Sequence, residues 1–375
     1  MMYHKFLPIL FLVIFILKLF PFLNQSDTKE NKQYKQLKKH LEIYLEIKNK
    51  GGWQNLKEGP ALIFGIVNPR VRDLKKRLFI TKEFIPISES FSDTFDINLE
   101  NAIKKYQHNH GLNTTGIVDQ ITIRELNNSI DKRIHQIKLN MERWKEMPAK
   151  LDKLHILINI AAGDLDVIVQ DSSVLKMKVI VGRLYRKTPV FNADMTYIEF
   201  NPYWIIPPGI MKRDILPKLK NNLSYLELNH MQIYDHQKII KTKNINWDNF
   251  YLKDCPYKII QSPGSENPMG VVKFTFPNKY YVYLHDTPSR KLFEESSHTY
   301  SSGCIRLSKA RELAKYLLKQ DQEWSSKKVD SLIDTEKNKI IYLMSPVKVY
   351  VNYFTVWISK DGSLQFAPDI YKRDI

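Results

Sequence analysis

The sequence predicts an α+β protein of several domains, with an apolar N-terminal segment, a helical region and a β-rich C-terminal region. Three observations support this class. Apolar residues recur every three to four positions through much of residues 31–145, which is the period of an amphipathic helix. From residue 154 onward they alternate with polar residues, which is the period of a half-buried strand. The chain has 375 residues, enough for two or three domains with separate cores.

The N-terminal segment is expected to be a membrane anchor. Residues 6–23 are apolar except for Lys18 and two prolines, and about twenty apolar residues are just enough to span a bilayer. No small-residue cleavage site follows, so an uncleaved anchor over residues 1–28 is favoured over a cleaved signal peptide. Lys5 precedes the apolar run, which places the N-terminus in the cytoplasm and the remainder of the chain outside it.

The net charge of +17 is carried mostly by lysine. Such a charge suits nucleic acid, an anionic membrane surface or an acidic wall polymer. The sequence has no zinc-finger spacing, RNP motif or basic helix with heptads, so nucleic acid is not an expected partner. It also lacks metal-ligand spacings and the glycine-rich motifs of nucleotide sites, so no metal and no other cofactor is expected.

Helical periodicity divides the first part of the chain into three units. Residues 29–69 are expected to form an amphipathic helix, ended by Gly51 and Gly52, and then a linker. Residues 70–128 form a small three-helix module, and residues 129–150 form a connecting helix stopped by a proline. The helices expected within the module cover residues 71–79, 99–110 and 119–126.

Residues 151–375 are expected to form one β-rich domain, a mainly antiparallel sandwich or barrel. Its first strands are expected at residues 154–160, 164–170 and 174–182. A segment near residues 201–250, rich in proline and lysine, interrupts the strands. An insertion of this length is usually a functional lid or a disordered excursion, and a helix near residues 209–219 favours a helical lid.

Residues 281–307 hold the candidate reactive site. His285 ends a strand expected over residues 280–284, and Cys304 follows in the next polar loop. A thiol becomes a nucleophile when an imidazole takes its proton and a positive charge stabilises the thiolate, and His285 and Arg306 are candidates for these two roles. By spacing alone the pair is weak, because free cysteines and single histidines are more often structural.

The loop before the cysteine is a candidate oxyanion hole. Gly303 permits a tight turn, in which the amides of Ser302, Gly303 and Cys304 could point at one spot. Tyr283 lies two residues before His285 and so faces the same side of the expected strand, where it lines a substrate pocket or belongs to the core.

These motifs resemble a known family. The pattern H-D-T-P-S-x-x-L-F followed by S-S-G-C-I-R-L is similar to the signature of the L,D-transpeptidase (YkuD) family, in particular its large YcbB-like branch. Ser302 stands where many members carry a second histidine. The spacing of apolar residues and Gly111 within residues 70–128 resembles a three-helix peptidoglycan-binding domain, although Thr115 precedes Gly116 where members usually have Asp-Gly. Binding of peptidoglycan and a role as a packing spacer both stay open for this module.

The resemblance implies two-step acyl transfer in cell-wall biogenesis. Cys304 attacks the carbonyl of the third residue of a tetrapeptide stem, releases D-alanine and forms a thioester. An amine of another stem then attacks the thioester to give a 3→3 cross-link. His285 acts as the base, with His298 as a rival. The same resemblance implies acylation by carbapenems, a substrate of peptidoglycan stem peptides, and a periplasmic protein attached to the inner membrane.

Three further residues have more than one interpretation. Arg306 binds a substrate carboxylate, polarises the loop or makes a structural ion pair. Trp204 contacts substrate or tethers the lid. Cys255 is buried and idle, or pairs with Cys304 in a disulfide that would silence the nucleophile.

Several reactions are compatible with the same site. An L,D-carboxypeptidase would use water as the acceptor, and attachment of a lipoprotein lysine to peptidoglycan would use another amine. A non-catalytic wall-binding protein is the alternative that lacks chemistry, and the presence of cysteine, histidine, glycine and arginine together argues against it.

Overall fold

The structure is a computed structural model that describes residues 31–86, 91–241, 245, 255–319 and 321–375. The predicted anchor at residues 1–28 lies outside these residues. Within the described part of the chain, none of the helices combines the length and the apolar character needed to cross a bilayer.

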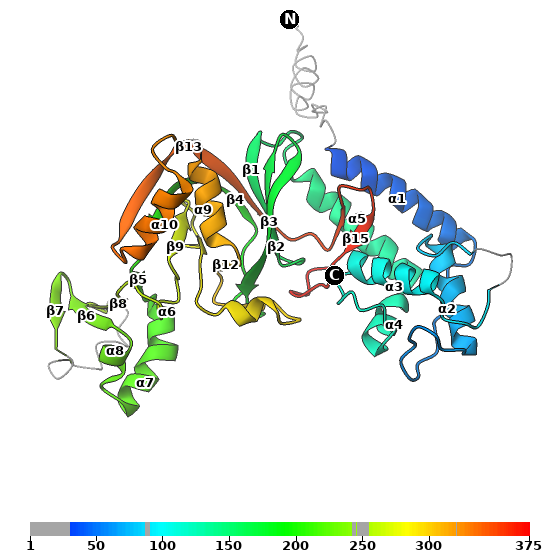
Figure 1. Cartoon of the computed structure of the whole chain (residues 1–375), viewed down its shortest axis with the longest axis horizontal. Helices are drawn as coiled ribbons and strands as arrows, with labels where there is room; N and C mark the ends of the chain where they lie inside the picture. Colours follow the sequence, from blue (N-terminus) through cyan, green and yellow to red (C-terminus); the bar gives the residue numbers. More distant parts are fainter. Residues whose placement is uncertain (1–30, 87–90, 242–244, 246–254, 320) are drawn as a thin grey trace, which may run out of the picture.

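Five helices precede the strands among the described residues (Figure 1), and the sequence predicted each of them. They are α1 (Lys32–Asn49), α2 (Pro69–Ile80), α3 (Ile97–Asn109), α4 (Gln120–Leu126) and α5 (Ile130–Lys145). Each begins after a polar side chain that accepts a hydrogen bond from a backbone N–H of the first turn, which is the usual cap of a helix. The capping residues are Asn31, Asn68, Asp96, Asp119 and Ser129. Helices α2 to α4 enclose a hydrophobic cluster of their own, which includes Leu74, Leu99 and Ile123.

The C-terminal residues join the helices to the strands. β14 (Val356–Ile358) and β15 (Leu364–Phe366) form a separate two-stranded sheet that packs against α1 and α5. The indole of Trp144 on α5 stacks on Phe354 with ring centroids 3.9 Å apart. β14 therefore does not join the main sheet, because it buries its apolar side chains against helices instead.

The main sheet is a closed barrel. Its strands are β1 (Leu154–Asn159), β2 (Asp164–Val169), β3 (Ser172–Gly182), β4 (Phe191–Phe200), β9 (Val272–Thr275), β10 (Leu284–His285), β12 (Ile305–Leu307) and β13 (Lys339–Asn352). They run in the order β3-β12-β10-β9-β4-β13-β1-β2, and β2 pairs with β3 to close the ring. The short strand β11 (Thr299–Ser301) also pairs with β3. Most pairs are antiparallel, but β1 with β13, β10 with β12 and β11 with β3 are parallel.

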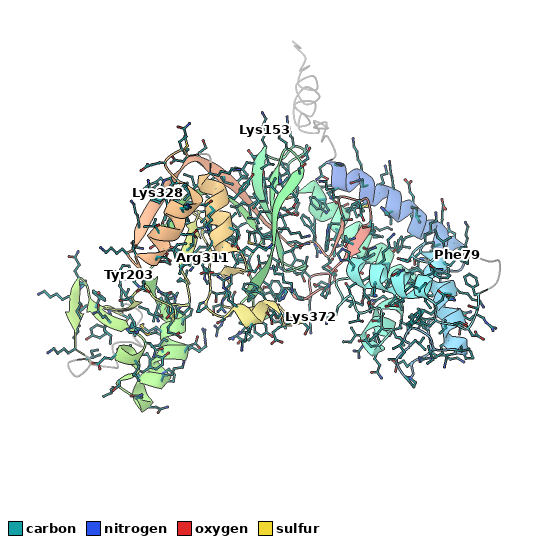
Figure 2. The ribbon with its side chains drawn as sticks, in the orientation of Figure 1. Phe79, Lys153, Tyr203, Arg311, Lys328 and Lys372 are labelled. Carbon is teal, nitrogen blue, oxygen red and sulfur yellow. The ribbon has the colours of Figure 1, made fainter. Side chains whose placement is uncertain are left out.

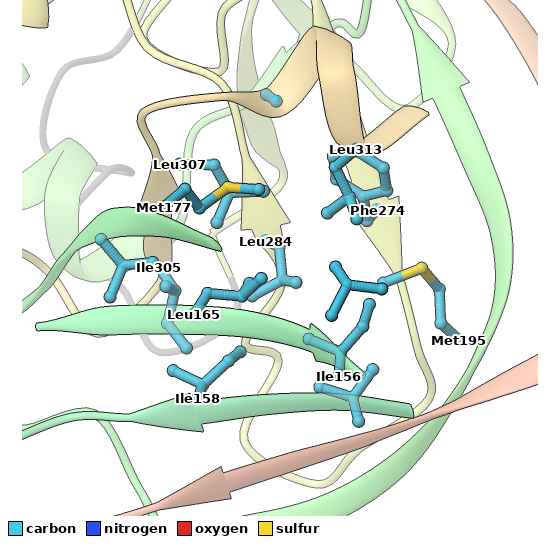
Figure 3. Close-up of a cluster of buried hydrophobic side chains, with 14 of the residues drawn as sticks. Ile156, Ile158, Leu165, Met177, Met195, Phe274, Leu284, Ile305, Leu307 and Leu313 are labelled. Carbon is cyan, nitrogen blue, oxygen red and sulfur yellow. The ribbon is translucent and has the colours of Figure 1, made fainter. Parts of the chain in front are cut away.

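The barrel encloses the largest hydrophobic cluster of the described residues. Alternate residues of the strands point inward and meet there, as Figure 3 shows for Ile156, Ile158, Leu165, Leu284 and Ile305. Helices α9 (Ala310–Leu318) and α10 (Ser326–Asp334) contribute to the same core.

Two details near α9 and α10 are not evident from the sequence. A serine just before a helix often caps it, but α9 begins after Lys309, and the backbone N–H of Ser308 donates to the carbonyl of Lys178 instead. Helix α10, whose cap is Ser325, was not predicted.

The insertion is larger than expected and is not only helical. It contains helices α6 (Pro208–Ile210), α7 (Leu216–Asn221) and α8 (Tyr225–Leu228), with a π-helical turn before α7. It also contains a four-stranded sheet of β5 (Trp204–Ile205), β8 (Tyr257–Gln261), β6 (Met231–Asp235) and β7 (Lys238–Ile240). The insertion has its own apolar core and projects from one side of the barrel (Figure 1).

Basic side chains are distributed over several elements. Lys153, Arg311, Lys328 and Lys372 lie well apart (Figure 2). Lys153 precedes β1, Arg311 and Lys328 lie on α9 and α10, and Lys372 is in the C-terminal tail. These four residues do not form one basic patch. The expectation that nucleic acid is not a partner therefore stays a prediction.

The stacking of Trp144 on Phe354 predicts a stability effect. Substitution Trp144→Ala removes a buried aromatic that joins α5 to the C-terminal segment, so it should lower the free energy of unfolding by about 3–5 kcal/mol. Denaturant unfolding followed by circular dichroism measures this change. Ile121→Ala, on an exposed position of α4, is the matched control and should change the free energy by no more than about 0.5 kcal/mol. Equal effects of the two substitutions would contradict the packing described here.

Candidate active site

The parallel pairing of β10 with β12 brings the predicted site residues together. His285 is paired with Arg306, and the backbone N–H of Ile305 donates to the carbonyl of Tyr283 at 3.1 Å. Cys304, which immediately precedes β12, therefore lies beside Tyr283. Because alternate residues of a strand share a face, these four side chains lie on the outer face of the barrel, while the residues between them enter the core.

His285 is held as a neutral imidazole. Its Nδ1 lies 2.6 Å from the backbone carbonyl of Asp286, and a carbonyl only accepts, so Nδ1 carries the hydrogen and Nε2 keeps its lone pair. Burial, followed by the positive charge of Arg306, lowers the pKa of His285 to about 3. The carboxylate of Asp286 is bonded elsewhere, to the backbone N–H of Val271 and to Arg290. The orienting group of the histidine is thus a backbone carbonyl.

Cys304 is a free, partly exposed thiol. Its Sγ lies 3.9 Å from the carbonyl oxygen of Tyr281, to which it can donate. Burial raises the pKa of the Cys304 thiol, while the backbone of Tyr283 and the charges of Lys273 and Arg306 partly offset that rise. At neutral pH the thiol of Cys304 and the imidazole of His285 are therefore both uncharged.

Hydrogen bonds within the loop before Cys304 fix its shape. Ser301 Oγ accepts from the N–H of Gly303 at 3.1 Å and donates to the carbonyl of Cys304 at 2.5 Å. Gly303 has a φ of 117°, which favours glycine, and its carbonyl accepts from Thr188 Oγ1 at 2.9 Å. The Gly303 amide, one of the predicted oxyanion donors, is therefore occupied by the loop itself. Within the described part of the chain, no acceptor is bonded to the amides of Ser302 and Cys304.

The segment before His285 differs from the prediction. A strand was expected over residues 280–284, but only Leu284 and His285 are in strand conformation. The side chain of Asn278 bonds the carbonyls of Phe276 and Val282 and the amides of Tyr280 and Val282. These bonds replace those of a strand ladder, and Tyr281 adopts a left-handed φ of 54°. Local hydrogen bonding thus overrides the strand preference of the aromatic residues.

An ion pair beside the site was not predicted. Lys273 on β9 pairs with His285 across the strands, and its Nζ lies 3.0 Å from Glu199 Oε2 on β4. The same Nζ lies 4.7 Å from the ring centroid of Tyr283. The positive charge of Lys273 lowers the pKa values of both His285 and Cys304. The alternation around Lys273 in the sequence indicates an outward position, but the pairing of β9 with β10 is needed to place it here.

Trp204, His298 and Cys255 are engaged elsewhere. Trp204 packs against the core of the insertion, as the tethering interpretation expected. His298 Nε2 lies 3.3 Å from the carbonyl oxygen of Phe293, so the rival base is bonded to a neighbouring turn. Cys255 is free, partly buried and packed against the core of the insertion, so it is not in a disulfide with Cys304. Among the described residues, no group of three or more His, Cys, Asp or Glu side chains is arranged to hold a metal ion.

Comparison with known families identifies the class of this site. Residues 153–341, about half of the chain, match the family described as the L,D-transpeptidase catalytic domain, YkuD. The chain therefore belongs to the YkuD L,D-transpeptidase family, which confirms the family predicted from the sequence motif. Residues 67–126 match a second family, described as "Putative peptidoglycan binding domain".

Individual relatives are similar over part of the chain. A Haemophilus influenzae protein named "Putative L,D-transpeptidase" is 31% identical over 242 residues, which cover 64% of this chain and 48% of that protein. The chain thus spans about half the length of this curated relative. A solved L,D-transpeptidase from Xylanimonas cellulosilytica is 12% identical, with 79% of this chain and 99% of that chain covered and a TM-score of 0.25. One from Stackebrandtia nassauensis is 11% identical, with 80% and 97% covered and a TM-score of 0.28. TM-scores this low carry no argument, so the family assignment rests on the sequence match.

The neutral thiol–imidazole pair predicts the pH dependence of thiol reactivity. In a Cys255→Ala background, the rate at which iodoacetamide alkylates Cys304 should keep rising above pH 9, because burial raises the thiol pKa. Intact-mass spectrometry at a series of pH values gives this rate. Free cysteine in the same buffers is the control and should reach its limiting rate at lower pH. A flat rate between pH 6 and pH 8 would indicate a preformed thiolate and contradict this description.

Proposed function

We propose that this protein is a cell-wall L,D-transpeptidase in which Cys304 is the nucleophile and His285 the general base. The observation that carries the proposal is the register of β10 and β12, which places both side chains on one face of adjacent strands. The neutral state of His285, whose Nδ1 is bonded to the carbonyl of Asp286, supports its role as a base. Membership of the YkuD family supports peptidoglycan stem peptides as substrates.

The first half-reaction is acylation of the thiol. Cys304 Sγ attacks the carbonyl carbon of the third residue of a tetrapeptide stem, while Nε2 of His285 takes the thiol proton. The bond to the terminal D-alanine then breaks, and the imidazolium returns the proton to the departing amine. The products of this step are a thioester on Cys304 and free D-alanine. The amides of Ser302 and Cys304 are the candidates for stabilising the oxyanion, since the Gly303 amide is bonded to Ser301.

The second half-reaction transfers the acyl group. An amine on the third residue of another stem attacks the thioester carbon, and His285 takes a proton from that amine as the carbon–nitrogen bond forms. The thiolate leaves and recovers a proton from the imidazolium. The product is a 3→3 cross-link between two stems, and no cofactor takes part in either step.

The other parts of the chain are assigned supporting roles. We propose that residues 70–128 bind peptidoglycan and that the insertion covers the substrate when it is bound. Arg306 and Tyr283 line the substrate site, and Trp204 tethers the insertion. Together these roles suit a protein of the periplasm, held at the inner membrane by residues 1–28. Water or a lipoprotein lysine as the acceptor would give a carboxypeptidase or an attachment enzyme with the same nucleophile.

Incubation with purified disaccharide-tetrapeptide stems tests the proposal. Wild-type protein should form cross-linked dimers and release D-alanine, whereas Cys304→Ala should form no dimer above background, because the thioester cannot form. Mass spectrometry of the muropeptides measures both products. Cys255→Ala is the matched control, since this thiol lies in the insertion and should be dispensable.

The product distribution distinguishes the alternatives. Tripeptides without dimers would indicate a carboxypeptidase. Dimers formed by Cys304→Ala would refute the nucleophile assignment. An intact-mass adduct of a carbapenem on wild type but not on Cys304→Ala would show that acylation occurs at Cys304 independently of any acceptor.

A further inference from the structure

Three arginines surround the loop that carries Cys304. Arg306 follows the cysteine by two residues on β12. Arg183 and Arg186 lie in the turn between β3 and β4, and this turn is fixed to the cysteine loop because the backbone N–H of Arg183 donates to the carbonyl of Ser301 at 3.1 Å. All three residues are thus joined to the cysteine loop or to the strand that follows it, and the charge of Arg306 acts on the thiol of Cys304.

Arg186 already has its partners. Its Nη1 donates to Ser302 Oγ at 2.7 Å and lies 3.9 Å from the carboxylate of Asp214 in the insertion. Asp214 is also bonded through both of its carboxylate oxygens to Arg213, at 2.9 and 2.7 Å. Arg186 thus shares the single carboxylate of Asp214 with Arg213.

Arg306 and Arg183 are not compensated in this way. The Nε of Arg306 is buried and has no hydrogen-bond partner in the described part of the chain. The groups whose charges act on Arg306 are Arg183 and the thiol of Cys304, and burial together with the charge of Arg183 lowers the pKa of Arg306. Arg183 donates to the phenol oxygen of Tyr185 at 3.3 Å, and neither arginine forms an ion pair with a described carboxylate. The charge of Arg183 contributes to lowering the pKa of Asp214, so that carboxylate offsets part of the charge of Arg183. Two neighbouring guanidinium groups with so little compensation are costly unless a ligand supplies a further counter-ion.

We propose that Arg183 and Arg306 form a carboxylate-binding subsite that takes the terminal carboxylate of the donor stem peptide. This inference rests on the proposed function, because it requires a stem peptide in the site. It goes beyond that function in two ways. It assigns a ligand group to Arg183, a residue outside every motif named above, and it explains how a stem that ends at its fourth residue is selected.

Peptide geometry supports this choice of ligand group. In a tetrapeptide stem, the terminal carboxylate is three bonds from the carbonyl carbon under attack, within about 4 Å. Arg306 lies two residues beyond Cys304 in extended backbone, about 7 Å along the strand, and its long side chain covers that distance easily. A carboxylate between two guanidinium groups can accept charge-assisted hydrogen bonds from both. A pentapeptide stem has a peptide bond in place of that carboxylate and would leave both arginines uncompensated.

Protection of Cys304 from iodoacetamide tests the subsite without requiring turnover. All variants carry Cys255→Ala, so that Cys304 is the labelled thiol. Three ligands are compared: the tetrapeptide stem, the same peptide with a terminal carboxamide, and the same peptide with the side-chain carboxylate of its third residue amidated. The concentration that halves the alkylation rate is measured for each ligand by intact-mass spectrometry.

For wild-type protein, the terminal carboxamide should require a concentration about tenfold or more above that of the tetrapeptide, as expected for loss of a charge-assisted interaction. Arg183→Ala should bring this ratio close to one, and Arg183→Lys should keep an intermediate ratio because it retains the charge. Arg311→Ala, which removes an exposed positive charge on α9, should leave the wild-type ratio unchanged. Alkylation without ligand reports that the thiol of each variant is intact.

Four outcomes would overturn the subsite. The first two are the absence of protection by the tetrapeptide and equal protection by the tetrapeptide and its terminal carboxamide. The third is the same ratio of carboxamide to tetrapeptide concentration in wild type and in Arg183→Ala. The fourth is loss of protection only for the peptide amidated at its third residue. Failure of the proposed function gives a different result, namely no cross-linked or trimmed muropeptide. If the protein distinguishes the tetrapeptide from its carboxamide but forms no cross-linked or trimmed muropeptide, the subsite is supported and the transferase activity is refuted.

Discussion

The parallel pairing of two very short strands, β10 and β12, is the constraint on which the site depends. Because side chains alternate along a strand, a slip of one residue would turn Cys304 or His285 into the barrel. Leu284 and Ile305 prevent that slip, since both are fully buried in the core between the outward-facing residues. Burial of two aliphatic side chains thus fixes the relative position of a thiol and an imidazole. The hydrophobic effect supplies the geometry, and the polar groups supply the chemistry.

The electrostatics of the site follow from the same arrangement. The strand pairing places Arg306 and Lys273 on either side of His285, one on each neighbouring strand. Two positive charges and burial all favour the neutral imidazole, which is the form that accepts a proton. The ion pair of Lys273 with Glu199 holds one of these charges in place, and Asn338 bonds the other oxygen of that carboxylate at 3.0 Å. Residues from four strands and a loop therefore set the protonation state of one side chain.

The cysteine loop is also connected to the C-terminal tail. Thr188 bonds the carbonyl of Gly303, and the Thr188 N–H donates to the phenol oxygen of Tyr371 at 3.1 Å. The tail that carries Tyr371 is held by Arg143 on α5, through an ion pair with Asp374 of 2.9 Å. A continuous series of contacts thus runs from α5 through the C-terminal tail to the loop that carries Cys304. The helices therefore help to hold this loop in place, whatever ligand they bind.

The sequence by itself determined the elements and the candidate residues. Helical spacing located α1 to α5, and alternation located the first strands, because both patterns depend on neighbours a few positions apart. The motif around His285 and Cys304 identified the family and marked these two residues as candidates for the reactive pair. Only the tertiary structure decided which groups surround that pair. Lys273, Glu199 and Arg183 reach the site through strand pairing, and Asn278 replaces an expected strand with a loop. Strand register depends on buried contacts between residues far apart in the chain, as in the pairing of β1 with β13. No local sequence pattern encodes those contacts.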